Sequence, residues 1–272
     1  MEELFSGLAN YEDFKRDLKQ SELIGTIILF DMTSSTNLKV KLGFPGWVTY
    51  LEKFSSIIEE SFPREKFKWR KFLGDAYLFF IPSEDNESEL LTGLKNVYQM
   101  SPLSAREIFS LTKQVMDSYW NFYKPYSKRE RGQNKNSEFR EITCAIDFGG
   151  EIVNWSQFQD TEGVFDPVGS TVDRCFRISS IAGPGQLLFS KNFKTQLEDD
   201  TLNPLNKSEY FKLSFPQGNL KGFPLDDSVF FRIPRKDYIN HILSPNQAEL
   251  IELSQPMSIK AKIKLLENNK TV

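Results

Sequence analysis

Two aspartates, Asp31 and Asp75, each end a short apolar segment, and neither segment contains a histidine or a cysteine. Taken singly, each is equally well explained as the end of a strand or as a turn residue. Taken together they favour a metal site, because Mg²⁺ and Mn²⁺ prefer oxygen ligands and leave coordination positions open for phosphate. Nucleoside triphosphate chemistry is therefore the first function to expect.

The composition restricts the possible partners. The 272 residues carry a formal charge of −3, with a pI near 5.5, which argues against nucleic acid because phosphate neutralisation needs a basic surface excess. Cys144 and Cys175 lie in apolar segments, as expected of buried, reduced thiols. No apolar run reaches the ~18 residues that cross a bilayer, and no signal-peptide pattern opens the chain, so we expect a cytoplasmic protein.

The elements that must position these aspartates alternate between strands and helices. Periodicity, caps and turn residues predict a helix within 1–22, a strand at 26–31, a helix at 37–42 that resumes after 43–46, a hairpin of strands 67–72 and 76–81, a capped helix from Ser104, a solvated loop at 127–137, strands 141–146 and 151–153, a helix at 170–181, a strand at 186–190, and a strand pair at 210–215 and 228–233. This order predicts an α+β fold, a ferredoxin-like βαββαβ core with added C-terminal strands and with helices on one face of a largely antiparallel sheet.

Five short segments occur in a fixed order: FDMTSST (30–36), KFLGD (71–75), DPVGSTVDRCFR (166–177), GPGQLL (183–188) and LKGF (220–223). In this order they resemble the successive motifs of class III nucleotidyl cyclases, the catalytic domains of adenylate and guanylate cyclases. The resemblance covers about residues 23–234, and it implies a catalytic domain there, between an N-terminal lead-in helix (1–22) and a C-terminal tail (235–272).

The resemblance implies a site for two divalent ions, Mn²⁺ or Mg²⁺. Asp31 and Asp75 match the metal-binding aspartates of the family, and the backbone carbonyl of Met32 matches the group that completes one metal site. One ion would lower the pKa of the ribose 3′-hydroxyl, and the other would bind the triphosphate and neutralise the departing pyrophosphate.

Substrate-binding residues are also implied by the resemblance. Lys71 matches the lysine that reads the base and Asp166 matches its acidic partner, while Lys221 matches the lysine that grips the terminal phosphates. Four further residues form the turn that opens the following helix, where backbone amides are placed to receive phosphate oxygens: Thr33, Ser34, Ser35 and Thr36.

Two residues of the 166–177 segment match catalytic positions. Arg177 matches the arginine that stabilises the pentavalent phosphorus, and Asp173 stands where the family usually has an asparagine that orients the ribose. An added negative charge near a triphosphate is unfavourable unless it is paired, and Arg174 is the neighbour expected to pair with it. The substitution keeps a catalytically dead nucleotide-binding dimer among the alternatives.

In class III enzymes the metal-binding aspartates and the base- and phosphate-binding residues come from opposite subunits. The resemblance therefore implies a head-to-tail homodimer with two composite sites and an inactive monomer. Neither nucleic acid nor a membrane is expected as a partner.

The base is not decided by the residue types. Lys71 and Asp166 nominally read adenine, but cytosine presents the same acceptor beside an amine, and uracil presents a carbonyl beside an N–H donor. Bulky side chains near the site would exclude a purine if they filled its space, although core packing also explains them: Phe30, Trp47, Tyr50 and Phe72.

The Asp-x-x-Ser-Ser-Thr segment that begins at Asp31, together with the lack of sensor, transmembrane and linker segments, is similar to the stand-alone Pycsar cyclases of bacteria. These make cyclic UMP or cyclic CMP on phage infection and activate a separate effector. We therefore expect a uridylate cyclase acting on UTP, with an adenylate cyclase as the alternative. A phosphatase that uses Asp31 as nucleophile is disfavoured because Thr33 replaces the second aspartate it needs, and the single histidine, His241, argues against histidine-based catalysis.

Overall fold

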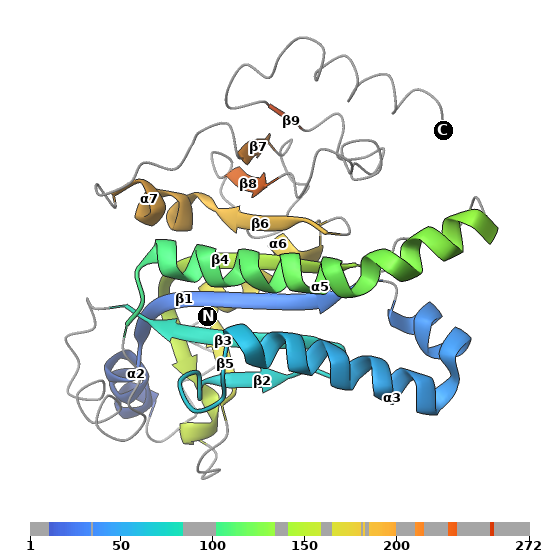
Figure 1. Cartoon of the computed structure of the whole chain (residues 1–272). Helices are drawn as coiled ribbons and strands as arrows, with labels where there is room; N and C mark the ends of the chain where they lie inside the picture. The colour runs from blue at the N-terminus through green and yellow to red at the C-terminus, as the bar shows by residue number, and fades with distance from the viewer. Residues whose placement is uncertain are drawn as a thin grey trace.

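A computed structural model describes residues 11–33, 35–83, 102–133, 141–158, 165–180, 182, 185–199, 210–214, 228–232 and 251–252 of the chain. Its elements, most of them labelled in Figure 1, are α2 (Tyr11–Gln20), β1 (Leu23–Met32), α3 (Ser35–Ser61), β2 (Arg70–Phe72), β3 (Ala76–Pro82), α5 (Ala105–Gln133), β4 (Ile142–Asn154), the 3₁₀ turn η1 (Trp155–Phe158), β5 (Pro167–Gly169), α6 (Ser170–Ser180), β6 (Leu187–Ser190), α7 (Lys191–Asp199), β7 (Tyr210–Ser214), β8 (Ser228–Arg232) and β9 (Ile251–Glu252). Within these residues, no helix combines the length and apolarity needed to span a membrane.

The strands form one mixed sheet in the order β2-β3-β1-β4-β6-β8-β7-β9, with β5 paired to β4. β1 pairs antiparallel with both β3 and β4, whereas β4 and β6 run parallel. The segment from β1 through α3, β2, β3 and α5 to β4 is the expected βαββαβ unit, and β6, β7 and β8 extend its sheet. The α+β, ferredoxin-like prediction is therefore confirmed.

Helices cover both faces of the sheet, so the prediction that they lie on one face is wrong. α3 and α5 lie together in front of the sheet in Figure 1. Cys175 of α6 places its sulfur 3.6 Å from the Ile27 carbonyl and 3.5 Å from the Ala145 carbonyl, so α6 packs across β1 and β4. Both strands are apolar on both faces over most of their length, and such strands need a cover on each side.

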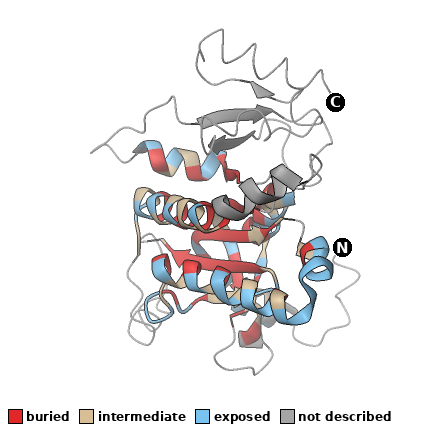
Figure 2. Cartoon of the chain, turned by 45° about the vertical axis from the view of Figure 1, so that its right-hand side comes forward, coloured by how far each residue is buried: buried red, intermediate tan, exposed pale blue. Residues whose placement is uncertain are grey.

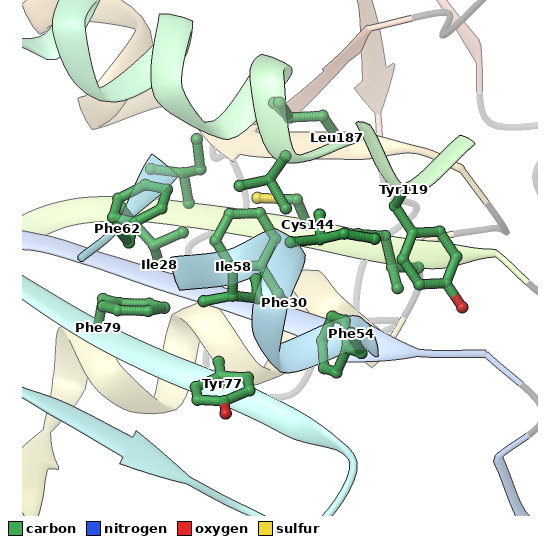
Figure 3. Close-up of a cluster of buried hydrophobic side chains, with 14 of the residues drawn as sticks. Ile28, Phe30, Phe54, Ile58, Phe62, Tyr77, Phe79, Tyr119, Cys144 and Leu187 are labelled. Carbon is green, nitrogen blue, oxygen red and sulfur yellow. The ribbon is translucent and has the colours of Figure 1, made fainter. Parts of the chain in front are cut away.

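Aromatic rings fill the core between the sheet and the α3–α5 layer (Figure 3). Phe30 of β1 meets Phe62 edge-on at 5.7 Å between ring centroids and Phe79 of β3 at 6.2 Å. Phe54 of α3 meets Tyr119 of α5 at 6.0 Å. Each such pair contributes about 0.5–1.5 kcal/mol beyond its burial. Figure 2 shows the result, with buried residues on the inward faces of α3 and α5 and exposed ones outside.

α3 contains the interruption that the sequence predicts. Gly43 has φ 65° and ψ 176°, a conformation that L side chains rarely adopt, and Pro45 follows it. Helical structure continues on both sides, from Ser35 and through Ser61. The first short helix therefore leaves the end of β1 at its own angle, and it carries the side chains nearest to Asp75.

Several other boundaries differ from expectation. The strand expected at 67–72 begins only at Arg70: the Trp69 carbonyl still accepts a bond from the Phe80 N–H at 3.0 Å, whereas the Phe67 N–H donates to the Pro63 carbonyl at 2.9 Å in a turn. The loop expected at 127–137 is helical through Gln133, as its Lys, Arg and Glu residues permit. The strands expected at 141–146 and 151–153 are one strand, irregular near Glu151, which has φ 53°.

Four elements were not anticipated, the first of them the 3₁₀ turn η1 after β4. α7 follows β6 directly, and the Ser190 hydroxyl accepts a bond from the Phe193 N–H at 3.1 Å as its N-cap. β5 and β9 are short strands that only sheet pairing reveals, and β9 lies within the expected C-terminal tail, for which no strand was predicted. The expected pair β7 and β8 is present and antiparallel.

Candidate active site

The two aspartates of the sequence prediction lie at the same end of neighbouring strands. Asp31 is in register with Ala76 of β3 on one side and with Thr143 of β4 on the other. Asp75 occupies the tip of the β2–β3 hairpin, and its carbonyl accepts a hydrogen bond from the Met32 N–H at 3.1 Å. Strand pairing thus brings together two carboxylates that are far apart along the chain.

The electrostatics of this end favour a cation. The pKa of Asp31 is raised to about 6, mainly by burial and in second place by the neighbouring charge of Asp75. A hydrogen bond from the Met32 N–H opposes this shift. An isolated carboxylate in such a place prefers to be neutral, whereas a divalent cation would stabilise both charges. The donor set therefore fits Mg²⁺ or Mn²⁺.

The described residues contain no cluster of three or more His, Cys, Asp and Glu side chains that could hold a metal. From the described residues, a divalent ion at Asp31 and Asp75 would thus have two carboxylate ligands. Mg²⁺ is commonly bound in this way, through one or two carboxylates with phosphate oxygens and waters completing the shell. The expected Met32 carbonyl ligand belongs to a buried residue at the end of β1.

Two α3 residues that sequence reasoning did not connect to Asp75 contact its carboxylate. The Ser35 hydroxyl donates to Asp75 Oδ2. Lys39 Nζ lies 3.5 Å from the same oxygen and 4.7 Å from the centroid of the Trp47 ring. The i, i+4 spacing of Ser35 and Lys39, which puts both on one helix face, is the signal that was available in the sequence.

The turn expected to bind phosphate is only partly open. The Thr33 N–H and hydroxyl both donate to the Glu141 carbonyl, at 2.9 and 2.5 Å. Ser34 lies outside the described residues. Thr36 is exposed in the first turn of α3, a turn that carries no acidic residue, so the positive end of this helix is not neutralised from within.

Lys71 and Asp166, the expected base-reading pair, are in contact. Lys71 Nζ donates to Asp166 Oδ1 at 2.5 Å across 95 residues of chain. The Asp166 N–H donates to the Asn154 side-chain oxygen at 2.8 Å, and the Trp155 N–H donates to the Asp166 carbonyl at the same distance. The carboxylate is therefore held by its backbone, and Asn154 is a supporting residue that sequence reasoning missed.

A stack of buried rings joins the two segments that carry this pair. Trp69, two residues before Lys71, stacks on Phe165 with centroids 5.8 Å apart and planes 14° apart. Trp69 also stacks on Phe80 at 5.1 Å. The stack explains why strand β2 and the segment before β5 meet.

The bulky residues proposed to limit the base are divided by the structure. Phe30 and Trp47 are buried in the core, and Tyr50 packs beside it with its hydroxyl 2.5 Å from that of Tyr119. Phe72, which follows Lys71 in the hairpin, is 46% exposed. Its ring contacts Tyr77 at 4.9 Å on the face of the hairpin opposite to Lys71, so Phe72 is exposed without lying beside the base-reading pair.

α6 presents its catalytic candidates on one face and anchors itself by the other. Asp173 is exposed and Arg177 is half-buried. The sequence predicted that Arg174 pairs with Asp173, but in the structure it pairs with a different aspartate. Its Nε and Nη2 donate to Asp147 of β4 at 2.8 and 3.0 Å. The prediction failed because Arg174 lies on the side of the helix that faces the sheet, where a fully buried carboxylate needs a partner.

Glycines allow α6 to approach the sheet closely. A Cβ on Gly149 would lie 2.5 Å from the Thr171 hydroxyl, which donates to the Gly150 carbonyl at 2.7 Å. Gly169, just before the helix, has φ 132°, and a Cβ there would lie 1.7 Å from the Glu151 carbonyl oxygen. The entry to α6 therefore accepts glycine alone.

Solved structures of adenylyl and guanylyl cyclases have a similar arrangement of elements. The adenylyl cyclase CyaB from P. aeruginosa matches with a TM-score of 0.53 at 15% identity, covering 82% of this chain and 98% of its own. Adenylate cyclases from Trypanosoma brucei give 0.52 at 14%, covering 86% and 96%. The guanylyl cyclase domain of the RhoGC fusion protein from the fungus Blastocladiella emersonii gives 0.50 at 15%, covering 79% and 97%.

The chain has the fold of a class III cyclase catalytic domain. No protein family and no curated protein matches its amino-acid sequence. Because both adenylyl and guanylyl cyclases share the cyclase fold with it, the fold leaves the base open.

The cyclase fold arranges the expected site residues in three groups. Asp31 and Asp75 lie at the β1 and hairpin ends, Lys71 and Asp166 pair beside β2, and Arg177 projects from α6 with Asp173. Lys221 and the residues of segment 220–223 lie outside the described residues, as do Gly183 and Pro184.

Proposed function

We propose that this chain is a class III nucleotidyl cyclase that converts a nucleoside triphosphate, with UTP preferred, into the 3′,5′-cyclic nucleotide and pyrophosphate. The carrying observation is the pairing of Asp31 with Asp75 at the end of β1 and the hairpin of a cyclase fold. Two neighbouring carboxylates, of which Asp31 has a raised pKa, have an evident use when a divalent ion binds between them.

The reaction makes one bond and breaks one. The ribose 3′-oxygen attacks the α-phosphorus, its proton leaves, and the bond from that phosphorus to the bridging oxygen of the β-phosphate breaks to release pyrophosphate. Divalent ions, when bound, would acidify the 3′-hydroxyl and neutralise the leaving group. The role of Asp31 and Asp75 is to hold those ions in place.

Arg177 supplies charge where the transition state develops it. A guanidinium beside the α-phosphate binds the pentavalent phosphorus more strongly than the ground state, so it raises turnover rather than affinity. We assign Lys221 to the terminal phosphates and the turn Thr33–Thr36 to the phosphate chain, through the amides that follow Thr33, because the Thr33 N–H is bonded to the Glu141 carbonyl. Asp173 on the same face of α6 is assigned to the ribose.

Base recognition falls to the Lys71–Asp166 pair. A lysine donor beside a carboxylate acceptor complements uracil through its carbonyl and ring N–H, and it complements adenine or cytosine through a ring nitrogen and an amine. The Asp-x-x-Ser-Ser-Thr segment, similar to that of Pycsar cyclases, supports UTP and a role in antiphage signalling through a separate effector. The alternative is an adenylate cyclase, favoured by the same pair in its nominal adenine-reading geometry.

A homodimer with composite sites is part of the proposal. Large apolar side chains stay exposed in the single chain near the site, among them Val40 at 82%, Phe44 at 79%, and also Phe72 and Phe176. We infer that a second copy covers the apolar side chains of α3 and the hairpin, because contiguous exposed apolar surface marks an interaction site. Lys71 and Asp75 share one hairpin. In a composite site they would serve different substrate molecules, and a second copy would supply the base- and phosphate-binding residues that face the metal site of the first.

The direct test incubates the purified protein with Mn²⁺ and each of the four nucleoside triphosphates, and identifies products by mass. Cyclic UMP with pyrophosphate is expected, and cyclic AMP would favour the alternative. Asp31→Asn and Asp75→Asn should each reduce turnover at least about a thousandfold. Nucleotide binding without any cyclic product would instead support a catalytically dead module.

Shared sites are tested by mixing inactive subunits. Asp31→Ala and Arg177→Ala proteins, each inactive alone, should recover up to about a quarter of the wild-type activity when mixed, because random pairing makes half of the dimers mixed and each mixed dimer carries one intact site of two. Mixtures that stay inactive while still forming mixed dimers would show that each site belongs to one chain.

A further inference from the structure

Lys39 holds the place of a cation at Asp75. Its ammonium lies 3.5 Å from Asp75 Oδ2 and over the face of Trp47, 4.7 Å from the ring centroid. Trp47 is itself buried, so the ring is a fixed surface against which the ammonium rests. The lysine is therefore held from two sides, by a carboxylate and by an aromatic face.

The same carboxylate oxygen has a second donor. Ser35, one helical turn before Lys39, donates its hydroxyl to Asp75 Oδ2. A carboxylate oxygen has about two lone-pair positions, so Oδ2 is fully used by Ser35 and Lys39. A metal ion that binds this oxygen must displace one of the two donors.

Lys39 is the donor that a metal would displace. An ammonium and a divalent cation that both contact Asp75 Oδ2 would repel each other. A serine hydroxyl carries no charge and can turn its hydrogen towards another acceptor. The Lys39 side chain is 43% exposed and that of Asp75 is 28% exposed, so the displaced ammonium has solvent beside it. The ion pair is then of the partly screened kind, which is weak enough to exchange.

We propose that Lys39 is an internal counter-ion of the metal site, which neutralises Asp75 in the metal-free chain and competes with divalent ions for it. This competition lowers the affinity of the Asp75 site for divalent ions. Occupancy of the site by metal then depends on a ligand that adds negative charge, such as the triphosphate that carries the metal. The inference rests on the proposed function, because it takes Asp75 as a metal ligand.

The test measures Mn²⁺ binding directly, by electron paramagnetic resonance of free Mn²⁺, without nucleotide. Lys39→Met removes the charge and keeps a good helix former, and it should bind Mn²⁺ about three- to tenfold more tightly than wild type. Lys39→Arg should stay within about twofold of wild type, because a cation remains there. Lys41→Met makes the same charge change two residues later, on a different face of the helix. Its Mn²⁺ affinity should also stay within about twofold of wild type.

A second readout follows the lysine itself. Mn²⁺ should change the Trp47 fluorescence of wild type as the ammonium leaves the ring, and Trp47→Phe identifies that component of the signal. Lys39→Met should lack the change. Unchanged or weaker Mn²⁺ binding by Lys39→Met would overturn the proposal. If Mn²⁺ binds neither protein, or binds Asp31→Asn as well as wild type, the metal site of the proposed function fails and the inference fails with it.

Discussion

At the scale of single residues, Asp31 shows how the fold changes a side chain. In an unfolded chain its carboxyl would titrate near 3.8, whereas burial and the charge of Asp75 raise the pKa to about 6. The folded state therefore holds more protons than the unfolded state between these values. The stability of the metal-free protein consequently falls as the pH rises through this window, and the loss is nearly complete by about pH 7, one unit above the folded pKa.

Replacing Asp31 by Asn should remove this pH dependence. At pH 7.5, without metal, the variant should be more stable than wild type by about 1 kcal/mol, a value discounted for the partial exposure of the group, and the difference should shrink towards pH 4. Urea denaturation at several pH values in EDTA measures it. A difference that does not vary with pH would contradict the electrostatic cause.

At the scale of elements, α6 carries two of the residues proposed for catalysis. One face binds the sheet through Thr171, Arg174 and Cys175, and the opposite face carries Asp173 and Arg177. The position of Arg177, the proposed catalytic arginine, is thereby tied to the buried ion pair of Arg174 with Asp147. Desolvation raises the pKa of Asp147, and the Arg174 guanidinium opposes that shift.

Removing one partner of this pair should destabilise the protein. Arg174→Met leaves the carboxylate of Asp147, which is 0% exposed, without its bidentate donor, and the expected loss is about 3 kcal/mol in urea denaturation. Arg177→Met, on the outer face of the same helix, should change stability by less than about 0.5 kcal/mol. If the two variants lose stability equally, the ion pair is not what anchors α6.

At the scale of the whole molecule, the sheet order separates two regions. The β2–β3 hairpin, with Phe72 exposed on it, forms one edge, while α7 follows β6 in the other half of the sheet. Dimerisation through the hairpin side would cover apolar surface next to Lys71 and Asp75. A dimer through the α7 side would leave that surface exposed.

Phe72→Asp should shift the protein towards the monomer and lower its activity at least about tenfold, because a charge is placed in an apolar contact. Asn192→Asp on α7, an exposed site with the same charge change, should leave both properties unchanged. Sedimentation velocity and activity at several protein concentrations measure the two effects. A dimeric Phe72→Asp protein would exclude the hairpin from the interface.

Local sequence determined the elements and the positions of the aspartates. The apolar run before Asp31, the glycine before Asp75 and the Ser104–Glu107 cap act over a few residues, so spacing alone reveals them. The cap, for example, is observed as bonds of 2.9 and 3.3 Å between these two residues. The segment order was likewise enough to predict the cyclase fold.

Tertiary structure alone decided which groups meet. Two aspartates were possible partners of Arg174, namely Asp147 and the adjacent residue Asp173. Arg174 pairs with Asp147 because α6 packs with this side against β4. The contact of Lys39 with Asp75 depends on how α3 follows β1, and the second helical face depends on the packing of α6 across β1 and β4. Such contacts join residues distant in the chain, and their energies depend on packing and burial that no local pattern encodes.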